Sequence, residues 1–165
     1  MEAVIEKALR ELIISEKNNF DFYCRAAEMV KDERTRRVFE HLACGELGYM
    51  HVFSTIYLGC EHCTDIKKLT KLPPDRTYPP YCALMDTSST NSCCEQRALE
   101  ISLREILACM RRYTTLAADL SNPRLHALFE RALRKAYAYY GVIHKEYLRV
   151  VETLGQPRKQ SCACH

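Results

Sequence analysis

Apolar residues recur at steps of three and four along four stretches of the chain, which is the spacing that gathers side chains on one face of an α-helix. The pattern predicts an all-α fold with helices over residues 2–30, 33–57, 95–120 and 124–154. One glycine and four prolines predict a long non-helical connection, residues 58–94, between the second and third helices. They are Gly59, Pro73, Pro74, Pro79 and Pro80.

Short turn signals separate the helices within each half. Residues 31–33 form a tight charged turn, and Asn122 followed by Pro123 has the order of an N-cap and a first helical residue. Gly155 and Pro157 end the last helix. Each half is therefore predicted to be an antiparallel helical hairpin, followed after residue 154 by a flexible tail, residues 155–165.

The two halves repeat each other at a constant offset of 90 residues. The offset relates aromatic, small and charged positions alike. Examples are Leu9 and Leu99, Tyr23 and Tyr113, Phe39 and Phe129, Glu40 and Glu130, Tyr49 and Tyr139, and Tyr57 and Tyr147. A duplicated hairpin with a long crossover is one way to build a four-helix bundle, so the sequence predicts a single domain of that kind over residues 1–154.

Two glutamates stand inside apolar stripes where a charge is unexpected. Glu16 lies between Ile13 and Phe20, and Glu46 lies between Leu42 and Tyr49. An unpaired ionised carboxylate is too costly to bury, so each must find a cation, a proton or strong hydrogen-bond donors. Two such carboxylates facing one core indicate a metal site or what remains of one.

The composition excludes several classes of function. A net charge of +3 is too small to indicate nucleic-acid binding, and no apolar run approaches the roughly 18 residues that a membrane span needs. The N-terminal segment is charged and amphipathic, unlike a signal peptide, which favours a cytoplasmic protein. Ten cysteines in a reducing compartment then indicate metal ligands or redox thiols rather than structural disulfides.

The first hairpin resembles the rubrerythrin-type di-iron domain of the ferritin-like superfamily. Glu16 and Tyr23 match that family's E-x6-Y helix, and residues 38–46, VFEHLACGE, match its xFExLAxxE segment. The resemblance implies a ferritin-like fold, bound iron, oxidoreductase activity and an electron-transfer partner. The family's ligands are one glutamate from each of two helices and a Glu-x-x-His from each of the other two.

Only two of these six ligand positions are kept. Both histidines are replaced by tyrosine, at Tyr49 and Tyr139, and the ligand glutamates of the second hairpin are replaced by Ile106 and Ala136. Ile106 and Ala136 are predicted to be ordinary core. The sequence thus predicts a degenerate di-iron site. It leaves open whether the protein is an enzyme.

Two interpretations of the carboxylates follow. Glu16, Glu46, Tyr49 and Tyr139 could hold one iron ion, because carboxylates and tyrosinate are ligands for ferric iron. Alternatively, the site holds no cofactor, and tyrosine hydroxyls or a shared proton satisfy the carboxylates.

The cysteines offer a separate location for the chemistry. Cys60 and Cys63 have the C-x-x-C spacing that binds one zinc ion or iron–sulfur cluster, or forms a redox pair. Further candidates lie in the same connection and in the tail: Cys82, Cys93, Cys94, Cys162, Cys164 and His165. On this interpretation the protein is a non-catalytic adaptor or sensor that binds zinc, a cluster or a protein partner through these segments.

A set of basic residues is predicted to lie at the surface of the helices, and a run of tyrosines is predicted to be partly core and partly exposed. The basic ones are interpreted as solvated helix faces: Arg34, Arg36, Arg37, Arg124, Arg131, Arg134 and Lys135. The outward members of the run Tyr137, Tyr139, Tyr140 and Tyr147 are candidates for a homodimer interface, because aromatic residues are enriched at interfaces.

Overall fold

The computed structural model describes residues 2–58, 68, 70–86, 94–118 and 122–155. These residues form helices and turns, with no strand among them. In chain order the helices are α1 (Glu2–Met29), α2 (Glu33–Leu58), α4 (Pro79–Met85), α5 (Cys94–Ala118) and α6 (Pro123–Gly155). The all-α prediction is confirmed, and the four long helices begin and end within about two residues of their predicted positions.

The connection between the hairpins is not wholly non-helical, contrary to the prediction. Pro79 and Pro80 occupy the first positions of α4. The N–H groups at these positions make no intrahelical hydrogen bond, so a proline is tolerated there, and its fixed φ suits the helix. The residue before them, Tyr78, is extended, as the residue before a proline prefers. The prolines that indicated a break therefore begin a short helix instead.

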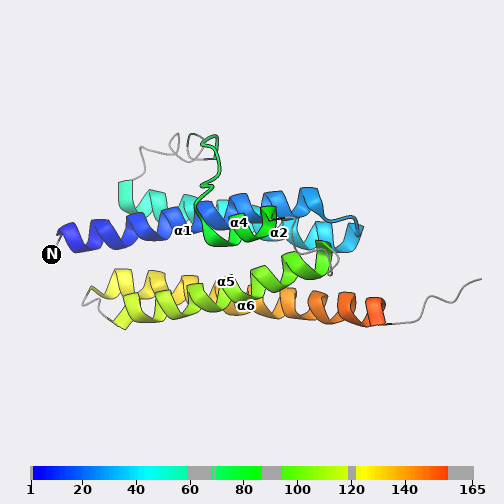
Figure 1. The fold of residues 1–165 in the computed structure, drawn as a ribbon. Coiled ribbons are helices and arrows are strands. Elements are labelled where there is room, and N and C mark those ends of the chain that lie inside the picture. Colours follow the sequence, from blue (N-terminus) through cyan, green and yellow to red (C-terminus); the bar gives the residue numbers. More distant parts are fainter. Residues whose placement is uncertain (1, 59–67, 69, 87–93, 119–121, 156–165) are drawn as a thin grey trace, which may run out of the picture.

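The long helices pair as two hairpins. Helix α1 packs along α2, and α5 packs along α6. Figure 1 shows the hairpin of α1 and α2 lying lengthwise beside that of α5 and α6, with α4 alongside α1. Helix α4 contacts both α1 and α5, so it bridges the two hairpins.

The tight turns are closed by equivalent caps. The side chain of Asp32 accepts a hydrogen bond from the Thr35 N–H at 2.8 Å, and that of Asn122 accepts one from the Leu125 N–H at 3.3 Å. Both satisfy an N–H that a helix start leaves without an intrahelical partner. The cap predicted at Asn122 is confirmed, and Asp32 is its counterpart in the repeat.

The interior preserves the repeat in three dimensions. Tyr23 pairs with Phe39 at a ring-centroid distance of 6.2 Å, and their counterparts Tyr113 and Phe129 pair at 6.3 Å. Ile106 and Ala136, predicted as ordinary core, are both buried.

Repeat partners also meet across the interface between the hairpins. The Asn19 amide donates to Cys109 Sγ at 3.8 Å, although the two residues are 90 positions apart. Contact between equivalent residues is expected near an approximate two-fold axis that relates the hairpins.

Among the parts of the chain that the structure describes, no helix is long and apolar enough to cross a bilayer.

A buried lysine between two carboxylates

The two unexpected glutamates lie together in the interior. Glu16 of α1 and Glu46 of α2 are 0% and 1% exposed, and the ammonium group of Lys135, from α6, binds both of them. Lys135 Nζ lies 2.6 Å from Glu46 Oε2 and also contacts Glu16 Oε2. The hydroxyl of Tyr113, from α5, donates to Glu16 Oε1 at 2.8 Å. All four long helices contribute to this lysine site, defined as Glu16, Glu46, Tyr113 and Lys135.

The prediction that Lys135 is a solvated surface residue is wrong, since it is only 6% exposed. The sequence carried the signal that could have corrected it. Leu128, Ala132, Lys135 and Tyr139 follow each other at steps of four, three and four, so Lys135 interrupts an apolar stripe as the two glutamates do. Basic neighbours such as Arg131 and Arg134 are exposed, and grouping Lys135 with them led to the wrong assignment of Lys135 to the surface.

The two tyrosines expected beside the carboxylates face the lysine with their rings. The ammonium nitrogen lies 4.6 Å from the ring centroid of Tyr49 and 5.5 Å from that of Tyr139. An ammonium over an aromatic face is attracted by the ring quadrupole. Tyr113, which was not among the predicted site residues, is the tyrosine that donates to a carboxylate.

Electrostatics assign different protonation states to the two carboxyl groups. Burial opposes ionisation of Glu16, but the charge of Lys135 and hydrogen bonds from neighbouring groups outweigh it, so the pKa of Glu16 falls below its ordinary value. Burial and the nearby charge of Glu16 raise the pKa of Glu46 well above its ordinary value. These shifts favour a Glu16–Lys135 ion pair, with a proton that the two carboxyl groups share held on Glu46.

Lys135 itself stays charged. Burial opposes its charge, but attraction to Glu16 and Glu46 prevails and raises its pKa. A protonated amine has no lone pair, so it serves neither as a nucleophile nor as a base. Its chemical contribution here is a fixed positive charge.

The lysine site does not fit the iron centre that the family resemblance implies. Iron needs its carboxylate ligands ionised and free to coordinate. Here Lys135 binds both carboxyl groups, burial and the Glu16 charge raise the pKa of Glu46, and Ile106 and Ala136 stand at two of the other ligand positions. A cation already occupies the space between the carboxylates, and it is the lysine ammonium.

The cysteine candidates are not brought together by the described part of the chain. Cys82 and Cys94 are exposed, and Cys82 Sγ donates to the carbonyl of Arg76 at 2.7 Å. Among the described residues, no three His, Cys, Asp or Glu side chains are grouped so that they could hold a metal ion. The other candidates lie outside the described residues: Cys60, Cys63, Cys93, Cys162, Cys164 and His165.

Cys109 is a buried thiol rather than a reactive one. Burial and the neighbouring carboxylate of Glu105 raise its pKa to about 11, so it is protonated at neutral pH. It donates to Glu105 Oε1 at 3.3 Å and accepts from Arg112 at 3.0 Å. Because the thiolate is the nucleophilic form, Cys109 is suited to packing.

A second buried ion pair anchors the connection between the hairpins. Lys17 and Asp21 are paired one turn apart on α1, and the Lys17 ammonium also donates to the carbonyl of Leu72 at 3.2 Å. Tyr78, just before α4, donates to the Asn19 side chain at 2.9 Å. These contacts attach residues 72–78 to α1.

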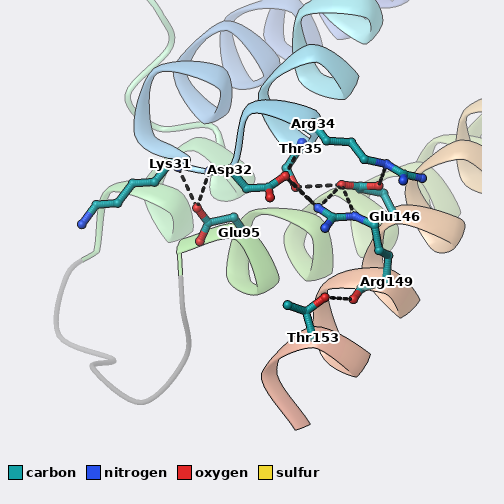
Figure 2. Close-up of polar contacts among 8 residues, drawn as sticks. All are labelled: Lys31, Asp32, Arg34, Thr35, Glu95, Glu146, Arg149 and Thr153. Atoms are coloured by element: carbon teal, nitrogen blue, oxygen red, sulfur yellow. Dashed lines mark hydrogen bonds and ion pairs between the residues drawn. The ribbon is translucent and has the colours of Figure 1, made fainter. Parts of the chain in front are cut away.

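A third polar group lies near the turn between α1 and α2 (Figure 2). This end cluster consists of Asp32, Thr35, Glu146 and Arg149. The buried hydroxyl of Thr35 donates to Glu146 at 2.8 Å, and Arg149 donates to Asp32 at 2.7 Å and to Glu146 at 2.6 Å. The end cluster joins the first hairpin to α6, and the lysine site does the same further along the helices.

The end cluster is internally compensated. Burial opposes ionisation of Glu146, but hydrogen bonds from Arg149 and Thr35 prevail and lower its pKa. Arg34 adds a further ion pair to Glu146 at 3.1 Å. Figure 2 also shows Glu95, at the start of α5, accepting from the backbone N–H groups of Lys31 and Asp32 at 2.6 and 3.1 Å. The cluster is thus a structural junction.

Comparison of this chain with protein-family models, with curated proteins and with solved structures finds no match.

Proposed function

We propose that this protein is a non-catalytic adaptor or sensor built on a ferritin-like four-helix bundle, in which a lysine takes the place of the metal. The single observation that carries the proposal is the contact of Lys135 with both Glu16 and Glu46. Side chains from four helices converge on this point, so the internal charge joins the hairpins without a cofactor.

The ferritin-like part of the proposal rests on the repeat and on the position of the site. Two hairpins with matching aromatic pairs face each other, and the carboxylates that match the family's ligands point into the space between them. A metal centre of this family is built from inward side chains on facing helices. Lys135 neutralises charge in that same kind of place.

The adaptor part of the proposal follows from what the site lacks. The carboxyl groups and the ammonium of the lysine site are buried and paired with one another, so the site offers neither a nucleophile nor a free base. Buried ion pairs that cannot react are best explained as determinants of structure and specificity. Function then belongs to the surface, where Cys82 and Cys94 of the predicted cysteine-rich connection expose their thiols.

The experiment is a titration with Mn²⁺ followed by electron paramagnetic resonance. Manganese prefers oxygen ligands, so it reports on the carboxylates and not on the ten cysteines. Wild type is expected to bind no Mn²⁺ at the lysine site. Lys135→Met removes the competing charge and should create a site, and adding Glu16→Gln and Glu46→Gln should abolish it again. Arg134→Met, at the exposed neighbouring position, is the matched control and should behave as wild type.

Iron analysis of protein purified without oxygen completes the test. Wild type is expected to carry no iron that depends on the carboxylates. Stoichiometric iron that disappears in the Glu16→Gln, Glu46→Gln variant would overturn the proposal and restore a metal-dependent redox protein as the better interpretation.

A further inference from the structure

Helix α6 carries an exposed seam that is separate from the face it buries against the other described helices. The α6 seam consists of Tyr137, Gly141, His144, Leu148 and Val151. All five residues are exposed, with Tyr137 at 62%, Leu148 at 46% and Val151 at 38%. Their spacing alternates between four and three residues, which is the spacing of the contact positions in a coiled coil. The seam follows the helix for about four turns, or roughly 20 Å.

The seam is distinct from the face that α6 uses within its own chain. That inner face is buried and includes Ala136, Ile143 and Val150. Each of these lies one residue from a seam position, about 100° around the helix. A helix that is apolar on two sides is typical of one that packs against two neighbours.

The borders of the seam differ from each other. One border carries exposed charges, Arg131, Lys145 and Glu152, for which the described residues provide no ion pair. The other border is aromatic or aliphatic, with Tyr140, Tyr147 and Leu154. The ring of Tyr140 stacks on that of His144 at 5.6 Å and 8°, which gives the middle of the seam a flat, ordered surface.

We propose that two copies of this chain associate through the α6 seam as an antiparallel pair of helices. The register places the two-fold axis between Gly141 and His144, so that Tyr137 packs on Leu148 of the partner subunit. In this register Glu152 lies within two residues, about 3 Å along the helix, of the level of Arg131 of the partner subunit, on the charged border. Symmetry forms that pair twice, while the apolar borders meet on the other side of the interface.

Charge complementarity selects the antiparallel arrangement. In a parallel pair each residue aligns with its own copy, which would leave Arg131 and Glu152 about 30 Å apart along the helix and without partners. Opposite charges beside an apolar seam set partner choice and orientation in coiled coils. Only the antiparallel register brings these two residues together.

The centre of the seam allows close approach. A Cβ atom added at Gly141 would meet nothing within 4 Å, so the backbone of α6 is open at that position. The partner's His144 side chain lies opposite in the proposed register and fills this space. A glycine at a helix crossing lets the two backbones approach more closely than larger residues do.

Sedimentation equilibrium of the full chain in reducing buffer tests the proposal. Wild type is expected to dimerise in the range of about 1–100 µM. Leu148→Glu, which places a charge in the seam, should weaken association by at least about tenfold. Val142→Glu is the matched control, because Val142 is equally exposed on α6 but lies off the seam, and it should leave the dimer unchanged.

Charge reversal tests the orientation separately. Arg131→Glu and Glu152→Arg should each weaken the dimer by about threefold to tenfold, and the double variant should restore it. Circular dichroism must show each variant to be fully helical. Two results would overturn the proposal. One is a wild-type chain that remains monomeric above 100 µM, which would leave the seam to another protein. The other is a dimer that Leu148→Glu does not affect. Additive single-variant losses without rescue would overturn the antiparallel register.

Discussion

Gly45 of α2 lies against the phenolic oxygen of Tyr139 of α6. A Cβ atom built on Gly45 would lie 1.8 Å from that oxygen, so no larger residue fits without movement of the ring. The repeat relates Gly45 to Lys135 and Tyr139 to Tyr49, and the equivalent contact exists, since Lys135 Nζ lies 4.6 Å from the Tyr49 ring. One position of the repeat has therefore become a glycine in one hairpin and the buried cation in the other.

Gly45→Ala is expected to destabilise the protein by about 1–3 kcal/mol, because the methyl group overlaps the Tyr139 hydroxyl in a packed interior. Gly48→Ala, one turn later in α2, is the control. An added Cβ there meets nothing, so the better helix propensity of alanine should stabilise it by about 0.5–1 kcal/mol. Urea unfolding measures both. Adding Tyr139→Phe should recover part of the Gly45→Ala loss, and equal effects of the two alanines would contradict the contact.

Glu16→Gln and Glu46→Gln should differ sharply at pH 7 although the substitutions are chemically identical. Glu16 balances Lys135 and accepts from Tyr113, so its replacement transfers the negative charge to Glu46 and weakens the Tyr113 hydrogen bond, at a cost of about 1–3 kcal/mol. The raised pKa of Glu46 favours its protonated form, and glutamine reproduces the acceptor and the donor of that form without titrating, so this change should be neutral or stabilising at pH 7. Urea unfolding in reducing buffer compares them. Equal losses would show that both carboxylates are charged.

The free energy of unfolding of Glu46→Gln, relative to that of wild type, should rise with pH. Because the folded pKa of Glu46 is raised above the ordinary value of 4.5, its stabilising contribution is complete below pH 4.5 and is lost as pH rises through the folded pKa. Glutamine does not titrate, so the variant should gain on wild type by at most about 1.4 kcal/mol per pH unit above 4.5. Unfolding at pH 5, 6, 7 and 8 measures this difference, and a constant difference would contradict it.

Thr35→Val should destabilise the junction between the first hairpin and α6. The Thr35 hydroxyl is buried between Asp32 and Glu146, and its removal leaves a buried carboxylate with one donor fewer, at a cost of about 1–3 kcal/mol. Thr153→Val is the control, since the exposed Thr153 hydroxyl donates to the Arg149 carbonyl one turn back and lies outside the buried contacts of the end cluster. Its effect should stay within about 0.5 kcal/mol. Thermal unfolding of both variants tests the contrast.

The apolar spacing by itself determined the helices and their approximate ends. It also indicated that Glu16 and Glu46 are buried, because a helix of fixed period assigns each residue to a face before any partner is known. The Asn122 cap depends only on neighbouring residues, and it too was predictable. The prolines were ambiguous signals, since the same residue type either breaks a helix or begins one. Pro79 and Pro80 begin a helix, α4.

The identity of the partner that balances the carboxylates was decided only by the tertiary structure. Lys135 lies 119 residues from Glu16 and 89 from Glu46, and no local rule connects them. Periodicity places Lys135 on an inner face, but a long basic side chain at such a place can also extend to solvent. Burial became favourable once α1, α2 and α6 met at one point. There two carboxylates and two tyrosine rings replaced the water that the ammonium lost.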